Sequence, residues 1–159
     1  MDTSVYCPVF REDKLFCWLD NCSHWYDVGG MVMGSFVPQA VDIFHEGMPV
    51  PPIKVVARGK LQRDVEELLR RRSRLPEQCG LELRSQLAGL AVAKQRMVEL
   101  LQRYGAATVK GVMRRMLDQT EQTVRKRLAT LPEGTWHDVT YLGCVAPNDR
   151  TLRQQVMTL

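Results

Sequence analysis

The chain has 159 residues, of which 45% are hydrophobic, and its formal net charge is +4. This length and composition suit one domain with a real core and exclude a largely disordered chain. No run of eighteen apolar residues occurs and the N-terminus lacks a signal-peptide pattern, so we expect no membrane span and a cytoplasmic protein.

Charge is unevenly distributed along the chain. Residues 1–50 contain two basic and seven acidic residues, whereas residues 58–115 contain fourteen basic and six acidic residues. A basic stretch is one mark of nucleic-acid binding. Here, however, the basic side chains share amphipathic helical faces with glutamates, and no aromatic residues interleave to stack on bases. We therefore expect no nucleic-acid partner. The five cysteines form no CxxC pair, which argues against a zinc ribbon and against a disulfide scaffold.

The first fifty residues predict two strands followed by loops. Residues 5–10 and 15–21 are rich in β-branched and aromatic residues, and the polar tetrapeptide 11–14 between them predicts a β-hairpin with a four-residue loop. Because two strands alone are not stable in water, the hairpin needs a sheet to join. Residues 22–52 then contain eight glycines and prolines among ionisable groups. They predict a shaped loop region, where functional sites tend to lie.

After this loop region the hydrophobic period becomes helical. It predicts a short helix that begins near Leu61 and ends around the basic cluster Arg70–Arg72. A long helix then begins at Ser73 or Pro76 and ends at Tyr104, and a third helix covers 109–131. Gly105 is suited to a tight turn between the two long helices, which predicts an antiparallel helical hairpin. Thr135–Leu142 then predicts a C-terminal strand.

The order of these elements indicates an α+β fold. We divide the chain into a strand and loop segment (1–57), a helical segment (58–134), and a strand with a divergent tail (135–159), all within one partial domain. The predicted sheet has too few strands to cover helices about 40 Å long, at 1.5 Å per residue. We therefore expect the chain to be a fragment of a larger fold.

The spacing His24-x-x-Asp27, followed by Gly29 and Gly30, marks a candidate metal site. An imidazole and a carboxylate this close in the chain can bind one divalent ion such as manganese, iron or zinc. Two ligands are not a complete site. His45 is a third candidate because it lies in the same loop region. The alternative is that Asp27 caps a turn and that His24 is hydrogen-bonded nearby. No residue is singled out here as catalytic.

Several motifs in order resemble the hydantoinase B and 5-oxoprolinase family, which includes N-methylhydantoinase B subunits and the alpha subunits of acetone carboxylases. The resemblance covers residues 5–140, and single phrases such as Arg71–Pro76 are most similar to the acetone carboxylase alpha branch. The motifs are Pro8–Phe10, His24–Gly30, Gly34–Pro38, Ile43–Gly47, Pro51–Lys54, Leu83–Ala88, Arg103–Gly105 and Leu131–Thr135.

The resemblance implies a subunit that works with an ATP-using, hydantoinase A-like beta subunit. That partner binds ATP and phosphorylates an oxygen of the substrate. This subunit then completes the carboxylation of a ketone, or the hydrolysis of a cyclic amide such as hydantoin or 5-oxoproline. The resemblance further implies that His24 and Asp27 are metal ligands, with manganese the first expectation. A divalent cation of this kind acts as a Lewis acid.

The chain also departs from the family pattern. Family subunits are several hundred residues long, and the ligands that precede this segment would come from the missing parts of the subunit. We therefore expect the chain to be inactive alone, and we expect the tail after Val145 to lie outside the family pattern. The alternative function is a non-catalytic assembly fragment that docks through its helical hairpin.

Overall fold

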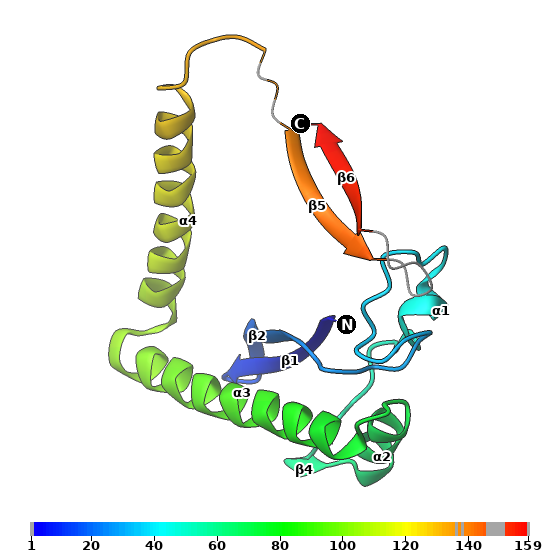
Figure 1. Cartoon of the computed structure of the whole chain (residues 1–159). Coiled ribbons are helices and arrows are strands. Elements are labelled where there is room, and N and C mark those ends of the chain that lie inside the picture. The colour runs from blue at the N-terminus through cyan, green and yellow to red at the C-terminus, as the bar shows by residue number, and fades with distance from the viewer. Residues whose placement is uncertain (1, 136, 138, 146–151, 159) are drawn as a thin grey trace. The chain divides into compact units, whose positions relative to one another are not determined.

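The computed structural model describes residues 2–135, 137, 139–145 and 152–158. It combines small antiparallel strand pairs with several helices (Figure 1). The elements in chain order are β1 (Asp2–Arg11), β2 (Lys14–His24), α1 (Ile43–Glu46), β3 (Val56–Ala57), β4 (Lys60–Leu61), α2 (Arg63–Arg71), α3 (Pro76–Tyr104), α4 (Ala106–Leu128), β5 (Val139–Val145) and β6 (Leu152–Thr158). Each strand pairs with its immediate neighbour in sequence, so the described strands form three separate two-stranded sheets.

The N-terminal strand pair has a tighter turn than the sequence predicts. β1 and β2 pair from Asp2 opposite His24 to Arg11 opposite Lys14. This register leaves two residues in the turn rather than four. Glu12 and Asp13 have φ values of 49° and 60°. Two consecutive residues with positive φ match the twist of the flanking strands, which is why a two-residue connection suffices.

The two units into which the chain divides are residues 1–99 and 100–159. In the first unit, the β1–β2 pair lies along α3 (Figure 1) and shares a core cluster with it. The hairpin was expected to join a larger sheet for stability. Here it is stabilised instead by packing against a helix. The buried members of the cluster are Val5, Trp25, Val28, Leu69, Cys79, Leu83 and Leu90.

Gln86 connects the strands to α3 inside this core. Its side-chain nitrogen Nε2 donates to the carbonyl oxygens of Thr3 and Asn21, both at 2.8 Å. Its oxygen Oε1 accepts a hydrogen bond of 3.0 Å from Trp25 Nε1. Gln86 is buried, and its one amide thus pairs three polar groups, one from each strand and one from the following loop.

In the second unit, Gly105 separates α3 from α4, with φ at 78°, as the sequence predicts. Val109, in the first turn of α4, is buried, but the larger apolar side chains further along the helix are exposed. The antiparallel packing of the two long helices is therefore not confirmed and stays a prediction. The exposed apolar residues of α4 are Val112, Met113, Met116, Leu117, Val124 and Leu128.

The C-terminal part contains one strand more than the sequence predicts. β5 begins at Val139, and β6 pairs with it from Val139 opposite Thr158 to Val145 opposite Leu152. β5 overlaps the strand expected over 135–142, whereas β6 was not expected, because the segment 152–158 has two adjacent glutamines and no aromatic residue and so gives a weak strand signal. Residues 136 and 138 of the expected strand lie outside the described residues. The division into 1–57, 58–134 and 135–159 stays a prediction.

Within the described part of the chain, none of the helices combines the length and the apolar character that crossing a bilayer requires.

Replacing Gln86 with leucine tests the buried connection. The change keeps the side-chain volume but leaves the indole of Trp25 and two carbonyl groups without partners, so we expect a loss of about 3 kcal/mol in the free energy of unfolding. Urea denaturation followed by circular dichroism measures this loss. Gln95→Leu is the matched control, because Gln95 is exposed on the same helix. A Gln86→Leu protein as stable as the control would contradict the assignment.

Candidate functional site

Asp27 is buried, and its carboxylate is surrounded by hydrogen-bond donors. The backbone N–H of Gly29 and the backbone N–H of Gly34 donate to its two oxygens at 3.1 and 3.0 Å. From the junction between α2 and α3, the Ser73 hydroxyl donates at 3.2 Å and the backbone N–H of Arg74 at 2.9 Å. The carboxylate therefore joins the glycine-rich loop to the junction between two helices.

Arg74 provides the fifth donor to this carboxylate. Its Nη1 lies 3.1 Å from Asp27 Oδ2, in an ion pair with a fully buried carboxylate. The same guanidinium also donates to the carbonyl oxygens of Gly30 and Val32. Arg74 thus fastens the backbone of the loop as well as pairing the buried charge of Asp27.

The charged form of Asp27 is favoured by this environment. Burial alone would raise the pKa of Asp27, but the backbone hydrogen bonds from Arg74, Gly34 and Gly29, together with the Arg74 side chain, hold the pKa below its usual value. Asp27 is therefore ionised at neutral pH, and a buried ionised carboxylate needs donors of this kind.

Two glycines after Asp27 allow close approach between backbone segments. Gly29 has a φ of 93°, and a Cβ there would lie 2.7 Å from the carbonyl oxygen of Arg72. Gly30 has a φ of 83°, and a Cβ there would collide with the carbonyl oxygen of His45. Beside candidate metal ligands, such glycines are expected to let the backbone pass close to a bound ligand. In the described structure, they make room for neighbouring parts of the same chain.

His24 lies on the outward face of the hairpin as the last residue of β2. Residues in β2 alternate between the core and solvent, and His24 falls in the solvent row with a side chain that is 75% exposed. Its Nδ1 forms an ion pair with Oδ1 of Asp2, the residue directly opposite it in the strand register. Trp25, directly after it, turns into the core instead.

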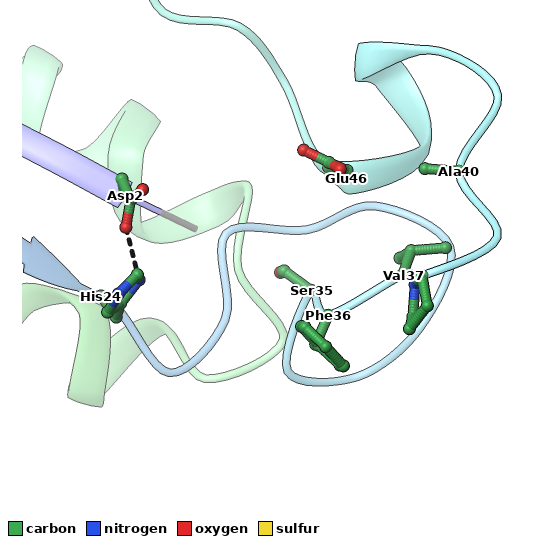
Figure 2. A pocket seen from close by; sticks show the side chains of 8 residues that line it. Asp2, His24, Ser35, Phe36, Val37, Ala40 and Glu46 are labelled. Carbon is green, nitrogen blue, oxygen red and sulfur yellow. Dashed lines mark ion pairs between the residues drawn. The ribbon is translucent and has the colours of Figure 1, made fainter. Parts of the chain in front are cut away.

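A shallow pocket next to His24 holds further polar groups. Figure 2 shows Asp2 and His24 facing each other on one side of this pocket and Glu46 of α1 on the other. Ser35 also lines the pocket, although its hydroxyl is already bonded to Val28 N and Gly29 O. The pocket therefore combines one exposed imidazole with two carboxylates.

His45 has partners within its own turn. It lies on the single-turn helix α1, which Asp42 caps by accepting from the backbone N–H of Phe44 at 2.9 Å. Its Nδ1 accepts a hydrogen bond of 3.3 Å from Val41 N, and its Nε2 lies 3.7 Å from Asp42 Oδ2. The contacts of the His45 imidazole are therefore local to the segment 41–45, whereas its backbone carbonyl oxygen accepts a hydrogen bond of 2.9 Å from Met31 N.

The three candidate ligands thus have three separate sets of partners. His24 pairs with Asp2, Asp27 with Ser73 and Arg74, and His45 with Val41 and Asp42. Among the described residues, no group of three or more histidine, cysteine or acidic side chains is arranged to hold a metal ion.

A divalent metal fits these residues only in part. The exposed ring of His24 is open to a ligand, whereas both oxygens of Asp27 are already occupied by donors. A cation at Asp27 would have to replace Arg74, which supplies a positive charge there already. Metal binding through His24, Asp27 and His45 stays a prediction, and we derive no chemical step from it.

Sequence reasoning missed the residues that hold Asp27. Ser73 was considered only as a possible helix start, and Arg74 only within the stretch Arg71–Pro76 that carries the family resemblance. No local signal reveals their role, because they lie 46 and 47 positions from Asp27. The position of Ser73 gives a partial indication, because a serine just before a helix commonly accepts a hydrogen bond from a nearby backbone N–H. Here its hydroxyl accepts from Leu75 N, just before Pro76 begins α3.

Comparison with known protein families identifies the family that this chain matches. The family model described as hydantoinase B/oxoprolinase matches residues 1–157. The match includes the C-terminal strands, so the expectation that the tail after Val145 departs from the family pattern was wrong. That expectation rested on the weakness of the local motifs in the tail, whereas the family model compares the whole segment.

Curated relatives are several times longer than this chain. The beta subunit of caprolactamase from Pseudomonas jessenii is 31% identical over 84% of this chain and 23% of that protein. The delta subunit of acetophenone carboxylase from Aromatoleum aromaticum is 30% identical over 99% of the chain and 23% of that protein. A putative D-/L-hydantoinase B subunit of a Pseudomonas strain is 29% identical over 85% of this chain and 23% of that protein. The chain therefore spans about a quarter of the length of these relatives.

A solved structure gives a similar result. The crystal structure of ATP-dependent caprolactamase from Pseudomonas jessenii superimposes with a TM-score of 0.73 and 30% identity, covering 89% of this chain and 24% of that one. The fold of this chain is therefore similar to that of one part of the longer caprolactamase chain.

Asp27→Asn tests the role of the buried carboxylate. The substitution leaves Arg74 without its counter-charge and turns an NH₂ group toward backbone donors, so we expect a loss of about 3 kcal/mol at pH 7. Because the pKa of Asp27 is lowered on folding, its contribution is complete above the unfolded pKa of about 4 and is lost as the pH falls further.

Urea denaturation between pH 7 and pH 2 measures this difference in stability. The gap between wild type and Asp27→Asn should be constant above about pH 5 and should close at lower pH, as linkage requires. Asp20→Asn is the control, because Asp20 is exposed on β2. A gap that is absent, or that widens on acidification, would refute this role.

Proposed function

Because the chain belongs to the hydantoinase B/oxoprolinase family, we propose that it acts as part of the catalytic subunit of an ATP-dependent enzyme with a small-molecule substrate. The proposal is supported by relatives that are subunits of a caprolactamase, an acetophenone carboxylase and a hydantoinase. We further propose a cytoplasmic location and an ATP-using, hydantoinase A-like partner subunit.

The proposed reaction is ATP-dependent hydrolysis of a cyclic amide. Several named relatives act on cyclic amides, as the words caprolactamase, hydantoinase and 5-oxoprolinase indicate. The second candidate is ATP-dependent carboxylation of a ketone, which the 30% identity to an acetophenone carboxylase chain favours. In either reaction the substrate-activating phosphorylation belongs to the ATP-using partner.

The observation that best supports a role within a larger subunit is an exposed apolar surface on the loop region. Residues 26–48 expose large apolar side chains, which include Val41 at 85% and Phe44 at 71%. Isolated soluble proteins seldom leave such a concentration uncovered. We call this segment the apolar loop, and its exposed members are Tyr26, Met31, Met33, Phe36, Val41, Ile43, Phe44 and Met48.

The apolar loop surrounds the polar pocket at His24. Phe36 lines that pocket together with His24, and Glu46 lies between Phe44 and Met48 in sequence. Covering the apolar loop with the remaining three quarters of a family subunit would enclose the pocket and exclude water from it, which strengthens electrostatic interactions there. The proposed metal ligation by His24, Asp27 and His45, with manganese, iron or zinc, belongs to that assembled state.

A non-catalytic assembly role is the alternative. In that case, the chain stabilises a larger complex through its exposed surfaces, and His24 has no part in the reaction. The exposed apolar residues of α4 support this alternative as well as the first proposal. The catalytic proposal and the assembly proposal differ in whether the polar groups of the pocket at His24 affect turnover.

A hybrid enzyme separates these two roles. The segment of the caprolactamase beta subunit that superimposes on this chain is replaced by the chain itself, and ATP-dependent hydrolysis of caprolactam is measured. We expect the hybrid to turn over, and we expect His24→Ala to lower kcat by about 10²-fold or more, the usual effect of removing a group that acts on the reacting centre. His137→Ala, at an exposed histidine of the second unit, is the control.

Three outcomes of this assay are distinguishable. Loss of activity in His24→Ala but not in His137→Ala supports the catalytic role. Equal activity in both variants supports the assembly role alone. A hybrid that folds but neither assembles nor turns over would contradict the proposed membership in such a subunit.

Substitutions in the apolar loop test whether it is a covered surface. In the isolated chain, Phe36→Ser and Phe44→Ser should reduce the fluorescence of a bound hydrophobic dye and reduce self-association, because both side chains meet solvent. In the hybrid, the same changes should weaken assembly. Leu81→Ser is the control, since Leu81 is equally exposed on α3, outside the loop. An effect of Leu81→Ser as large as that of the loop variants would count against the assignment.

A further inference from the structure

Arg72 differs from the arginines on either side of it. Arg70 and Arg71 form ion pairs with Glu67, and Arg74 pairs with Asp27. Among the described residues, no carboxylate pairs with Arg72. The side chain is nevertheless half-buried, and its Nε is buried without a hydrogen-bond partner.

The surroundings of Arg72 supply weak compensation for its charge. The guanidinium lies over the ring of Trp25, with 5.6 Å between its carbon and the ring centroid, and its Nη1 donates to the Met48 carbonyl at 3.2 Å. Arg72 also sits at the C-cap of α2, where the helix dipole favours a cation. Four of the five guanidinium N–H groups still lack an acceptor within the described residues.

The Cys79 thiol, which interacts electrostatically with Arg72, does not provide a negative charge. Burial raises the pKa of the Cys79 thiol to about 11, so this side chain is neutral at physiological pH. The Asp27 carboxylate is occupied by Ser73 and Arg74. Burial lowers the pKa of Arg72 itself, which reflects the cost of holding an unpaired cation there.

We propose that Arg72 is a receptor for a carboxylate supplied from outside the described residues. The planar guanidinium is suited to this role because its N–H groups match the two oxygens of a carboxylate. Two sources have this chemistry, a small carboxylic acid and an acidic side chain of another polypeptide segment. The exposed apolar side chains of Met48 and Leu68, whose carbonyl oxygens both accept from Arg72, would contact residues that flank such an acidic side chain.

This inference goes beyond the proposed function. It does not depend on the identity of the reaction, on His24 or on a metal. It assigns a role to a side chain that the network around Asp27 does not use.

Tryptophan fluorescence provides a direct measurement of binding at Arg72. The full chain is used with Trp18→Phe and Trp136→Phe, so that emission reports on Trp25 under the guanidinium. Sodium acetate is titrated at pH 7 and at constant ionic strength against sodium chloride. We expect a saturable change with acetate that Arg72→Gln weakens by about tenfold or more, since a charge-assisted hydrogen bond is lost.

Two further variants guard against misfolding as an explanation. Arg72→Lys keeps the positive charge without the planar fork and should bind acetate less tightly than wild type but more tightly than Arg72→Gln. Arg71→Gln is the matched control at the neighbouring exposed arginine and should bind acetate as wild type does. An acetate response that chloride reproduces, or that is the same in Arg72→Gln, would overturn the proposal.

A second ligand distinguishes the two sources of the carboxylate. The capped tripeptide acetyl-Leu-Glu-Leu-amide is titrated alongside acetate. Tighter binding of the tripeptide indicates an acidic side chain with apolar neighbours, whereas equal or weaker binding indicates a small carboxylic acid. Either result supports a carboxylate site at Arg72, and failure of both ligands to bind refutes it.

Discussion

The arrangement of the first unit depends on a buried carboxylate that is shared between two distant parts of the chain. Asp27 accepts three donors from the junction of α2 and α3 and two from its own loop. An ionised group cannot remain inside a protein without such partners, so the loop and the helical junction have to form together. The glycine-rich segment is thereby fixed against α2 and α3 rather than left free. This constraint also determines where His24 and the apolar loop are presented.

The local pattern of the sequence predicts the helices well. Residues 63–71 and 76–104 follow from apolar spacing, and Pro76 begins α3 because its fixed φ and missing N–H suit a first helical position. The turn at Glu12 and Asp13 and the strand β6 were not predicted correctly. Turn length depends on a strand register set by both partners, and β6 has a weak strand propensity of its own.

The candidate site shows the same limit of local reasoning. The spacing of His24 and Asp27 correctly marks a segment rich in polar contacts, but it does not reveal that one side chain points outward and the other inward. The strand alternation that ends at His24 and the burial of Trp25 separate the two. The alternative considered for Asp27, a carboxylate that caps a turn, agrees with its bond to Gly29 N. Contacts with Ser73 and Arg74 required the folded chain.

Hydrogen exchange at single amides tests the central role of Asp27 most directly. The amides of Gly29, Gly34 and Arg74 all donate to this carboxylate, although Arg74 lies 47 positions away from it. The account predicts that all three are protected at pH 7 and that Asp27→Asn accelerates their exchange together, while amides in the middle of α4 are unaffected. If Arg74 kept its protection when the loop amides lost theirs, the loop and the helical junction would not be joined through Asp27.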